Sequence, residues 1–266
     1  MRVHKINHTE RRLKRALKVF LLLFCAALAA NAQPPDKPAS QTSAEDTSQQ
    51  VVVAGGLQDL PNSPVAQVRS ERSWELGPIA YWGNGFGDRD QFRFFAAGFQ
   101  IGKAITPVVR AGILSGQFEL AGNIQPIWQA YTPSPHMQAF VYKGMTYTAP
   151  IGGGTYTGFS LTPVILRWNF LTRSERIQPW FQGAGGLIYT THKFPPDVLV
   201  PHGIPGGTSV WNFSPQGGFG IHWFTQRRRS IDLGVNAVHI SSASLGDRNP
   251  GVNALIQIQA GYTWWK

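Results

Sequence analysis

The segment "AVHISSASLGDRNPGVN" near the C-terminus places a histidine two residues before a serine, His239 and Ser241. A serine hydroxyl is a weak nucleophile unless a base removes its proton, and imidazole, whose pKa lies near neutrality, is the usual base. Side chains two residues apart on a strand point to the same face, with Cβ atoms about 6.5–7 Å apart. A hydroxyl and an imidazole at this spacing can meet, so the pair is a candidate for nucleophilic catalysis.

The strand face that would carry this pair is otherwise apolar. If residues 229–242 form a strand, the face continues through Leu233, Val235 and Ala237. Two polar groups on such a face cost free energy unless the face contacts a molecule with polar groups that interact with them. Taken alone the pair is weak evidence, because a long chain contains several His-x-Ser pairs by chance and a histidine at a strand end is more often interfacial than catalytic.

Eight strands are predicted by alternation with a period of two and by enrichment in aromatic and β-branched residues. Many of them exceed the usual length of strands in soluble proteins and could cross a bilayer at a tilt. We expect them near residues 73–83, 92–103, 115–131, 156–171, 176–191, 209–225, 229–242 and 251–265.

The last of these strands shows the pattern most clearly. Its polar face holds Asn253, Gln257, Gln259 and Thr263, and its other face is apolar, with Val252, Ala254, Ile256, Ile258, Ala260, Tyr262 and Trp264. Apolar-out and polar-in alternation is typical of membrane barrels. The sequence therefore predicts an all-β protein, an eight-stranded antiparallel up-and-down transmembrane β-barrel.

A soluble sandwich or a lipocalin-like barrel is the alternative, with the apolar face turned inward. Two observations disfavour it. Compact connections such as "FLTRSERI" alternate with long Gly/Pro-rich ones near 132–155 and 192–208, as in outer-membrane barrels. Tryptophans near strand ends suit the two interfaces of a membrane: Trp74, Trp82, Trp128, Trp168, Trp180, Trp211, Trp223 and Trp264.

The first 32 residues have the pattern of a secretory signal peptide. A basic start is followed by an apolar run from Val19 to Ala30 and by a small-residue cleavage site, Ala30-Asn31-Ala32. The one cysteine, Cys25, follows Phe24, where a lipoprotein signal requires a small residue. Residues 33–70, rich in Pro, Ser and Gln, are interpreted as a flexible linker. Residues 71–266 are then the outer-membrane barrel.

Removal of this segment changes the charge of the protein. Of the 24 basic and 14 acidic residues, seven and one lie in residues 1–32, which leaves 17 and 13 and a net charge of +4 instead of +10. A nucleic-acid partner is therefore not expected. With the mature N-terminus in the periplasm, His239 and Ser241 would lie at the outer rim and face outer-leaflet lipid.

The segment "AVHISSASLGDRNPGVN" resembles the C-terminal signature of the PagL-type lipid A 3-O-deacylases, a family also described as acyloxyacyl hydrolase-like. The segments "SLTPVILRWNF" and "IQPWFQGAGGLIYT" are also similar to that family. The resemblance implies an eight-stranded outer-membrane barrel that uses no cofactor and removes the ester-linked 3-O-acyl chain of lipid A in lipopolysaccharide. It implies His239 as the base and Ser241 as the nucleophile, and it leaves a homodimer open.

Two positions depart from the family pattern. The residue after the nucleophile is usually Asn in the family and is Ser242 here. The next residue, Ala243, matches the family, and Asn249 matches the Asn of its Asn-x-Gly segment. The family's acid falls on Asn253, which can orient an imidazole but cannot neutralise an imidazolium. The resemblance implies that Ser242, Ala243 or Asn249 supports the oxyanion or the loop, and Asp247 is an alternative acid in the same loop.

A second function therefore stays open, a structural or adhesive barrel without activity whose site has degenerated with the loss of its acid. The remaining histidines give no sign of a metal site. His136, His192, His202 and His222 lack the spacing of metal ligands and are expected at the surface or the membrane interface.

Overall fold

The computed structural model describes residues 60, 62–142, 144–151, 153–194, 209–242 and 254–266. No helix in this part of the chain is long and apolar enough to span a membrane. Its regular elements are α2 (Pro64–Glu71), β1 (Trp74–Gly85), η1 (Gly87–Arg89), β2 (Arg93–Ala104), η2 (Gly112–Leu114), β3 (Gly116–Tyr131), β4 (His136–Tyr142), β5 (Met145–Ile151), β6 (Thr155–Phe170), β7 (Ile177–Phe194), β8 (Ser209–Phe213), β9 (Gln216–Gln226), β10 (Arg229–His239) and β11 (Ala254–Trp265).

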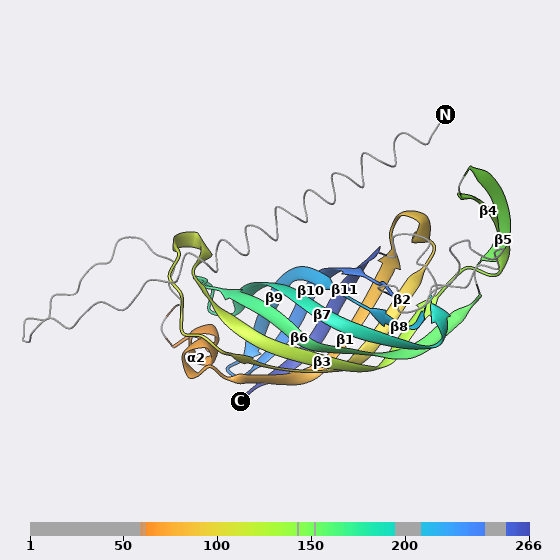
Figure 1. Cartoon of the computed structure of the whole chain (residues 1–266). Helices are drawn as coiled ribbons and strands as arrows, with labels where there is room; N and C mark the ends of the chain where they lie inside the picture. Colours follow the sequence, from red (N-terminus) through yellow and green to blue (C-terminus); the bar gives the residue numbers. More distant parts are fainter. Residues whose placement is uncertain (1–59, 61, 143, 152, 195–208, 243–253) are drawn as a thin grey trace, which may run out of the picture. The chain divides into compact units, whose positions relative to one another are not determined.

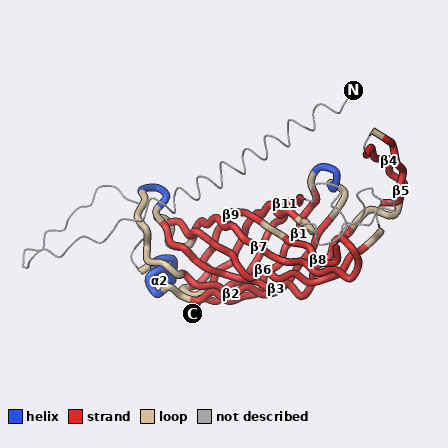
Figure 2. Tube along the Cα trace, in the orientation of Figure 1, coloured by secondary structure: helices blue, strands red, loops and turns tan. Residues whose placement is uncertain are grey.

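Eight of the described strands form a closed antiparallel barrel in the order β1, β2, β3, β6, β7, β9, β10 and β11 (Figures 1 and 2). The ring closes where β1 pairs with β11, with Ile79 opposite Gly261. Closure pairs both edges of the sheet, which a barrel in lipid requires because the hydrocarbon offers no hydrogen-bond partners. The predicted eight-stranded barrel is confirmed.

Three short strands lie outside this ring. β4 and β5 form a hairpin within residues 132–155, a range for which the sequence predicted only an irregular loop. The predicted strand 209–225 is interrupted at Pro215, which has no N–H for the ladder, so β8 and β9 are separate elements. Both nevertheless pair with β7 in one continuous register, Phe213 with Leu187 and Gln216 with Ala184.

The two ends of the barrel differ. At the terminal end Trp74 and Lys266 exchange two backbone hydrogen bonds of 2.7 and 2.8 Å, and α2 lies at this end too (Figure 1). Two of its connections are compact, the six residues 171–176 between β6 and β7 and the two residues 227–228 between β9 and β10. The opposite end, called here the loop end, carries the β4–β5 hairpin and the junction of β10 with β11.

Helix α2 shows that the predicted linker is wrong at its C-terminal end. Ser63 caps the helix by accepting the N–H of Ala66, and Pro64 occupies its first position. Val65 and Val68 pack against Phe224 and Trp265 of the barrel. Residues 64–70 therefore belong to the folded unit, whereas residues 1–59, which contain the predicted signal peptide and most of the linker, lie outside the described residues.

Arg69 and Glu71 attach α2 to the turns of the terminal end. The guanidinium of Arg69 donates to the backbone carbonyls of Asn169 and Phe170 at 3.1 and 2.7 Å. Glu71 accepts from Arg228 at 2.6 Å, and a hydrogen bond from Gln67 together with this guanidinium lowers the pKa of its carboxyl group. These contacts fix the helix to the turns at the terminal end of the barrel.

The barrel exterior is apolar, as predicted, but the aromatic belts are smaller than predicted. Trp74, Trp223 and Trp264 are exposed near the terminal end, and Trp82 and Trp211 are exposed near the loop end. The strand segment from Trp74 to Trp82 is roughly 26 Å long at 3.3 Å per residue, which corresponds to about 20 Å of membrane depth at a strand tilt of about 40°. The assignment of two further tryptophans to the belts is wrong, because they point into the barrel: Trp128 and Trp180. Trp168 lies on the outward face of β6, between the inward-facing Arg167 and Asn169, where Phe118 and the η2 turn cover it.

The two ends of the barrel interior differ in polarity. At the terminal end, charged and amide side chains such as Glu75, Arg167 and Gln259 fill it. At the loop end the interior is an apolar cluster that a uniform polar-in pattern did not predict: Ile79, Tyr81, Phe92, Phe94, Ala96, Trp128, Ala130, Ile188, Phe194, Val238, Ile240 and Leu255. This apolar layer lies behind the strand ends that carry His239 and Ser241.

Candidate functional site

His239 is the last residue of β10 and lies on its outward face. Burial alternates along the strand, with Leu233, Val235 and Ala237 exposed and the residues between them buried. His239 continues the exposed series, is half-buried, and lies opposite Ala254 of β11. The backbone N–H of His239 donates to the Pro215 carbonyl at 2.9 Å, which ties this strand end to the start of β9.

Ser241 continues the same face beyond the end of β10. It pairs with Phe213 of β8 through two backbone hydrogen bonds, Phe213 N–H to Ser241 O at 2.7 Å and Ser241 N–H to Phe213 O at 3.0 Å. This pairing keeps the register of β9 and β10, so the extended geometry reaches Ser241. Ile240 between the two is 1 % exposed and packs in the interior cluster, which directs the side chains of His239 and Ser241 outward.

The contact between β8 and Ser241 is the part of this site that the sequence did not predict. Phe213 fixes the backbone of Ser241, and the Ser241 N–H is occupied by this contact. An N–H already bonded within the sheet cannot serve as an oxyanion donor without breaking that bond. Donors for an oxyanion at Ser241 must therefore come from residues that follow it in the chain or from another element.

Ser242 points in the opposite direction. Its side chain is fully buried, and its Oγ atom has no hydrogen-bond partner among the described residues. The other predicted site residues, Ala243, Asp247, Asn249 and Asn253, lie outside the described residues.

An aromatic patch flanks the site on the outer surface. Trp211 of β8 lies 4.9 Å from Tyr189 of β7 and 5.9 Å from Phe159 of β6, measured between ring centroids. Phe159 and Trp211 are exposed, and Phe213 beside Ser241 is exposed as well. Amphipathic aromatic rings at this level are typical of the boundary between hydrocarbon and headgroups, which places the strand ends with His239 and Ser241 near such a boundary.

The model of the family "Lipid A 3-O-deacylase (PagL)" matches residues 116–263, more than half of the chain. The chain belongs to the lipid A 3-O-deacylase (PagL) family. The match covers β3 to β11 almost completely and includes both residues singled out from the sequence, His239 and Ser241. The predicted family is confirmed, and with the closed barrel it identifies a PagL-family protein of the outer membrane.

Solved structures similar to this PagL-family chain are also bacterial barrels. The crystal structure of the outer membrane enzyme PagL is 15% identical, with 71% of this chain and 98% of that chain covered and a TM-score of 0.38. Neisserial surface protein A is 12% identical, with 72% and 96% covered and a TM-score of 0.43. The N-terminal β-barrel domain of Pseudomonas aeruginosa OprF is 10% identical, with 73% and 98% covered and a TM-score of 0.35. No curated protein matches the chain.

Arg167 is the centre of the polar interior of this PagL-family barrel. Its Nη1 atom donates to Glu75 Oε2 at 2.9 Å and to Glu119 Oε1 at 2.8 Å. Its Nε and Nη2 atoms each donate to Gln182 Oε1 at 3.2 Å, and its guanidinium lies 5.0 Å from the ring centroid of Trp180. Strands β1, β3, β6 and β7 are thereby linked through the barrel interior.

We expect Arg167→Met to destabilise the barrel by roughly 3–5 kcal/mol, because two buried carboxylates would lose their shared cation. Detergent-solubilised protein should then lose its compact form on electrophoresis at a lower temperature than the wild type. Arg173→Met, in the exposed turn between β6 and β7, is the matched control and should change stability by about 0.5 kcal/mol or less. Equal stability of the two variants would show that another group neutralises the carboxylates.

Proposed function

We propose that this protein is an outer-membrane serine esterase that removes the ester-linked 3-O-acyl chain of lipid A. The observation that carries the proposal is the placement of His239 and Ser241 on one lipid-facing strand face. The family of the chain, the lipid A 3-O-deacylases, supports the same reading. The site would open sideways toward the outer leaflet, where lipid A resides. Such an arrangement lets the substrate reach the nucleophile without leaving the membrane.

The chemistry assigns one role to each residue. The Oγ atom of Ser241 attacks the ester carbonyl while His239 accepts its proton, which gives a tetrahedral oxyanion. The intermediate collapses to an acyl-serine, and His239 gives that proton to the leaving sugar oxygen, which departs as a hydroxyl. A water molecule, deprotonated by His239, then releases the fatty acid and restores Ser241. The backbone N–H groups of Ser242 and Ala243 and the side chain of Asn249 are the candidate oxyanion donors, since the N–H of Ser241 is bonded to Phe213.

The second candidate function is a structural or adhesive barrel without activity. It is favoured by one observation, the asparagine at position 253 where the family pattern has an acid. In serine proteases the loss of the corresponding carboxylate lowers turnover on the order of 10⁴-fold. Asp247 of the same loop could supply the missing charge.

Mass spectrometry of lipid A tests the proposal directly. Expression of the full chain in a bacterium whose lipid A keeps both 3-O-acyl chains should produce species that lack one 3-hydroxyacyl group. An empty vector and a barrel of another family, expressed to the same level, are the controls. Unchanged lipid A, with the protein folded in the outer membrane, would favour the barrel without activity.

A further inference from the structure

His222 of β9 was expected at the surface from its sequence, and that prediction is wrong. Its side chain is 1 % exposed and points into the polar interior of the barrel. The Nδ1 atom lies 2.7 Å from Asp232 Oδ1, and that carboxylate also accepts from the hydroxyls of Ser230 and Thr263. Because a carboxylate only accepts, Nδ1 carries a proton that it donates to Asp232.

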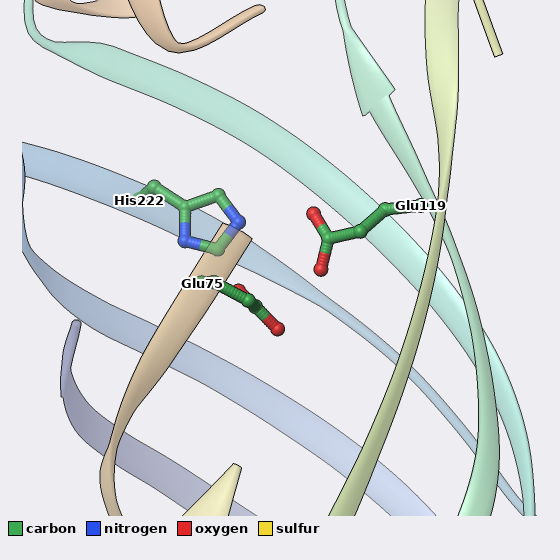
Figure 3. Close-up of side chains that lie close together, drawn as sticks. All are labelled: Glu75, Glu119 and His222. Atoms are coloured by element: carbon green, nitrogen blue, oxygen red, sulfur yellow. The ribbon is translucent and has the colours of Figure 1, made fainter. Parts of the chain in front are cut away.

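The Nε2 atom has no hydrogen-bond partner among the described residues, although it is completely buried. Figure 3 shows the imidazole of His222 converging with the carboxylates of Glu75 and Glu119. One ligand atom from each of the three residues lies within 4.8 Å of the other two. Two carboxylates and a ring nitrogen that converge in a buried position need a positive charge between them, which either a proton on Nε2 or a bound cation supplies.

The charges around this point favour a cation as well. The fully buried charged side chains of the described residues are three carboxylates, Glu75, Glu119 and Asp232, and two guanidiniums, Arg69 and Arg167. Arg69 donates to backbone carbonyls at the terminal end. Near His222, Arg167 therefore lies among three carboxylates, and uncompensated charge in a low-dielectric interior is costly.

We propose that Glu75, Glu119 and His222 bind a divalent cation of the zinc type inside the barrel. Zinc accepts one imidazole nitrogen and two carboxylate oxygens, and it commonly takes a water molecule as its fourth ligand. Each carboxylate oxygen has two lone pairs, so it can bind the cation and still accept its present hydrogen bond. The ion would link β1, β3 and β9, which are not neighbours in the sheet.

The groups behind the three ligands already have the arrangement that metal sites use. A ligating histidine usually donates its other ring N–H to a carboxylate, as His222 does to Asp232. Glu75 Oε1 accepts from Gln100 at 2.8 Å, and Glu119 Oε2 accepts from Asn169 at 2.7 Å. These bonds hold the carboxylates in place, and the Trp265 ring, 5.2 Å from that of His222 between centroids, covers the imidazole.

This site is separate from His239 and Ser241, and the proposal stands whether or not the protein deacylates lipid A. The ion would be structural, with a role in the stability of the barrel and none in the ester chemistry. It would explain why two glutamates lie next to a buried histidine whose Nε2 atom has no hydrogen-bond partner among the described residues.

In the experiment the mature chain is refolded in detergent, once with ZnCl₂ and once with a chelator. Free ions are then removed, and the zinc bound to the protein is measured. We expect one zinc ion per barrel after refolding with ZnCl₂. X-ray absorption at the zinc edge of the wild type should show one nitrogen and about three oxygen ligands at about 2.0–2.2 Å. Zinc should also raise the temperature at which the compact form is lost on electrophoresis.

His222→Gln should bind no zinc and lose the stabilisation by zinc, whereas His192→Gln, at an exposed histidine of β7, should behave as the wild type. If His222→Gln does not fold, the X-ray absorption spectrum of the wild type decides whether one nitrogen and about three oxygens bind the zinc ion. A wild-type barrel without zinc, or zinc bound equally by His222→Gln, would overturn the proposal. So would a nitrogen NMR signal of a doubly protonated His222 in the presence of zinc, which would place a proton where the metal is proposed.

Discussion

Ser241→Ala is expected to abolish the deacylation of lipid A, and His239→Ala is expected to do the same. In the proposed mechanism the serine forms the acyl bond and the histidine moves the proton, so neither step proceeds without its residue. Losses on the order of 10⁴-fold or more are typical when such a nucleophile or base is removed. The double variant should be hardly worse than either single variant, because the two residues act as one unit.

The measurement is the fraction of lipid A that retains both 3-O-acyl chains, with each variant expressed to the same level in the outer membrane. Ser209→Ala in β8 and His192→Ala in β7 are matched controls from the same end of the barrel, and both should leave the fraction of deacylated lipid A unchanged. Neither catalytic substitution removes a side chain from the interior cluster, so the barrel should fold as before. Activity that survives in Ser241→Ala would rule out the acyl-serine, and losses that simply multiply in the double variant would contradict a shared step.

The strands could be predicted from the sequence because their inner and outer faces differ at every second residue. Ile256, Ile258 and Ala260 are exposed in β11, as that alternation requires, and Gln259 between them is buried. The boundaries of β1, β2, β3 and β6 agree with the predicted ranges within two residues. The same alternation gave the outward direction of His239, which depends only on counting along β10.

The interior could not be predicted in the same way, because its contacts join residues from strands far apart in the chain. Arg167 meets Glu75, 92 positions away, and the pairing depends on how the barrel closes. The sequence analysis expected His222 at the surface or the membrane interface, and it predicted neither its inward direction nor its convergence with Glu75 and Glu119. The space for the Trp180 indole was not predicted either. It exists because positions 220 and 234 are glycines, where a Cβ atom would lie 2.4 and 2.5 Å from the indole ring.

Helix α2 was missed although its start has a recognisable signal. Ser63 followed by Pro64 is a common N-terminus of a helix, and Val65 and Val68 are three residues apart on one face. The helix is only eight residues long, and so short a helix is not stable by itself in water. Its stability comes from packing on Phe224 and Trp265 and from the hydrogen bonds of Arg69, which composition does not reveal.

Asn253→Glu is expected to raise the rate of deacylation, by up to about 10²–10⁴-fold if position 253 orients His239 as the family's acid does. An asparagine can accept the Nδ1–H of the imidazole and fix its tautomer, but it adds no negative charge. A glutamate at this position would stabilise the imidazolium that forms when Ser241 loses its proton, and it would raise the pKa of His239. Asn253→Ala should lower the rate, because the ring would lose its orientation.

The comparison with Asp247 determines which residue is the partner of His239. If Asp247 provides the charge, both substitutions at position 253 should be nearly neutral and Asp247→Asn should cause a severe loss of activity. The rate should be followed against pH, because a carboxylate next to His239 moves the acidic limb of the profile to higher pH. A faster enzyme with that shift in Asn253→Glu would assign position 253 as the orienting residue. No effect at either position, with Ser241→Ala inactive, would mean that His239 and Ser241 work without a third residue.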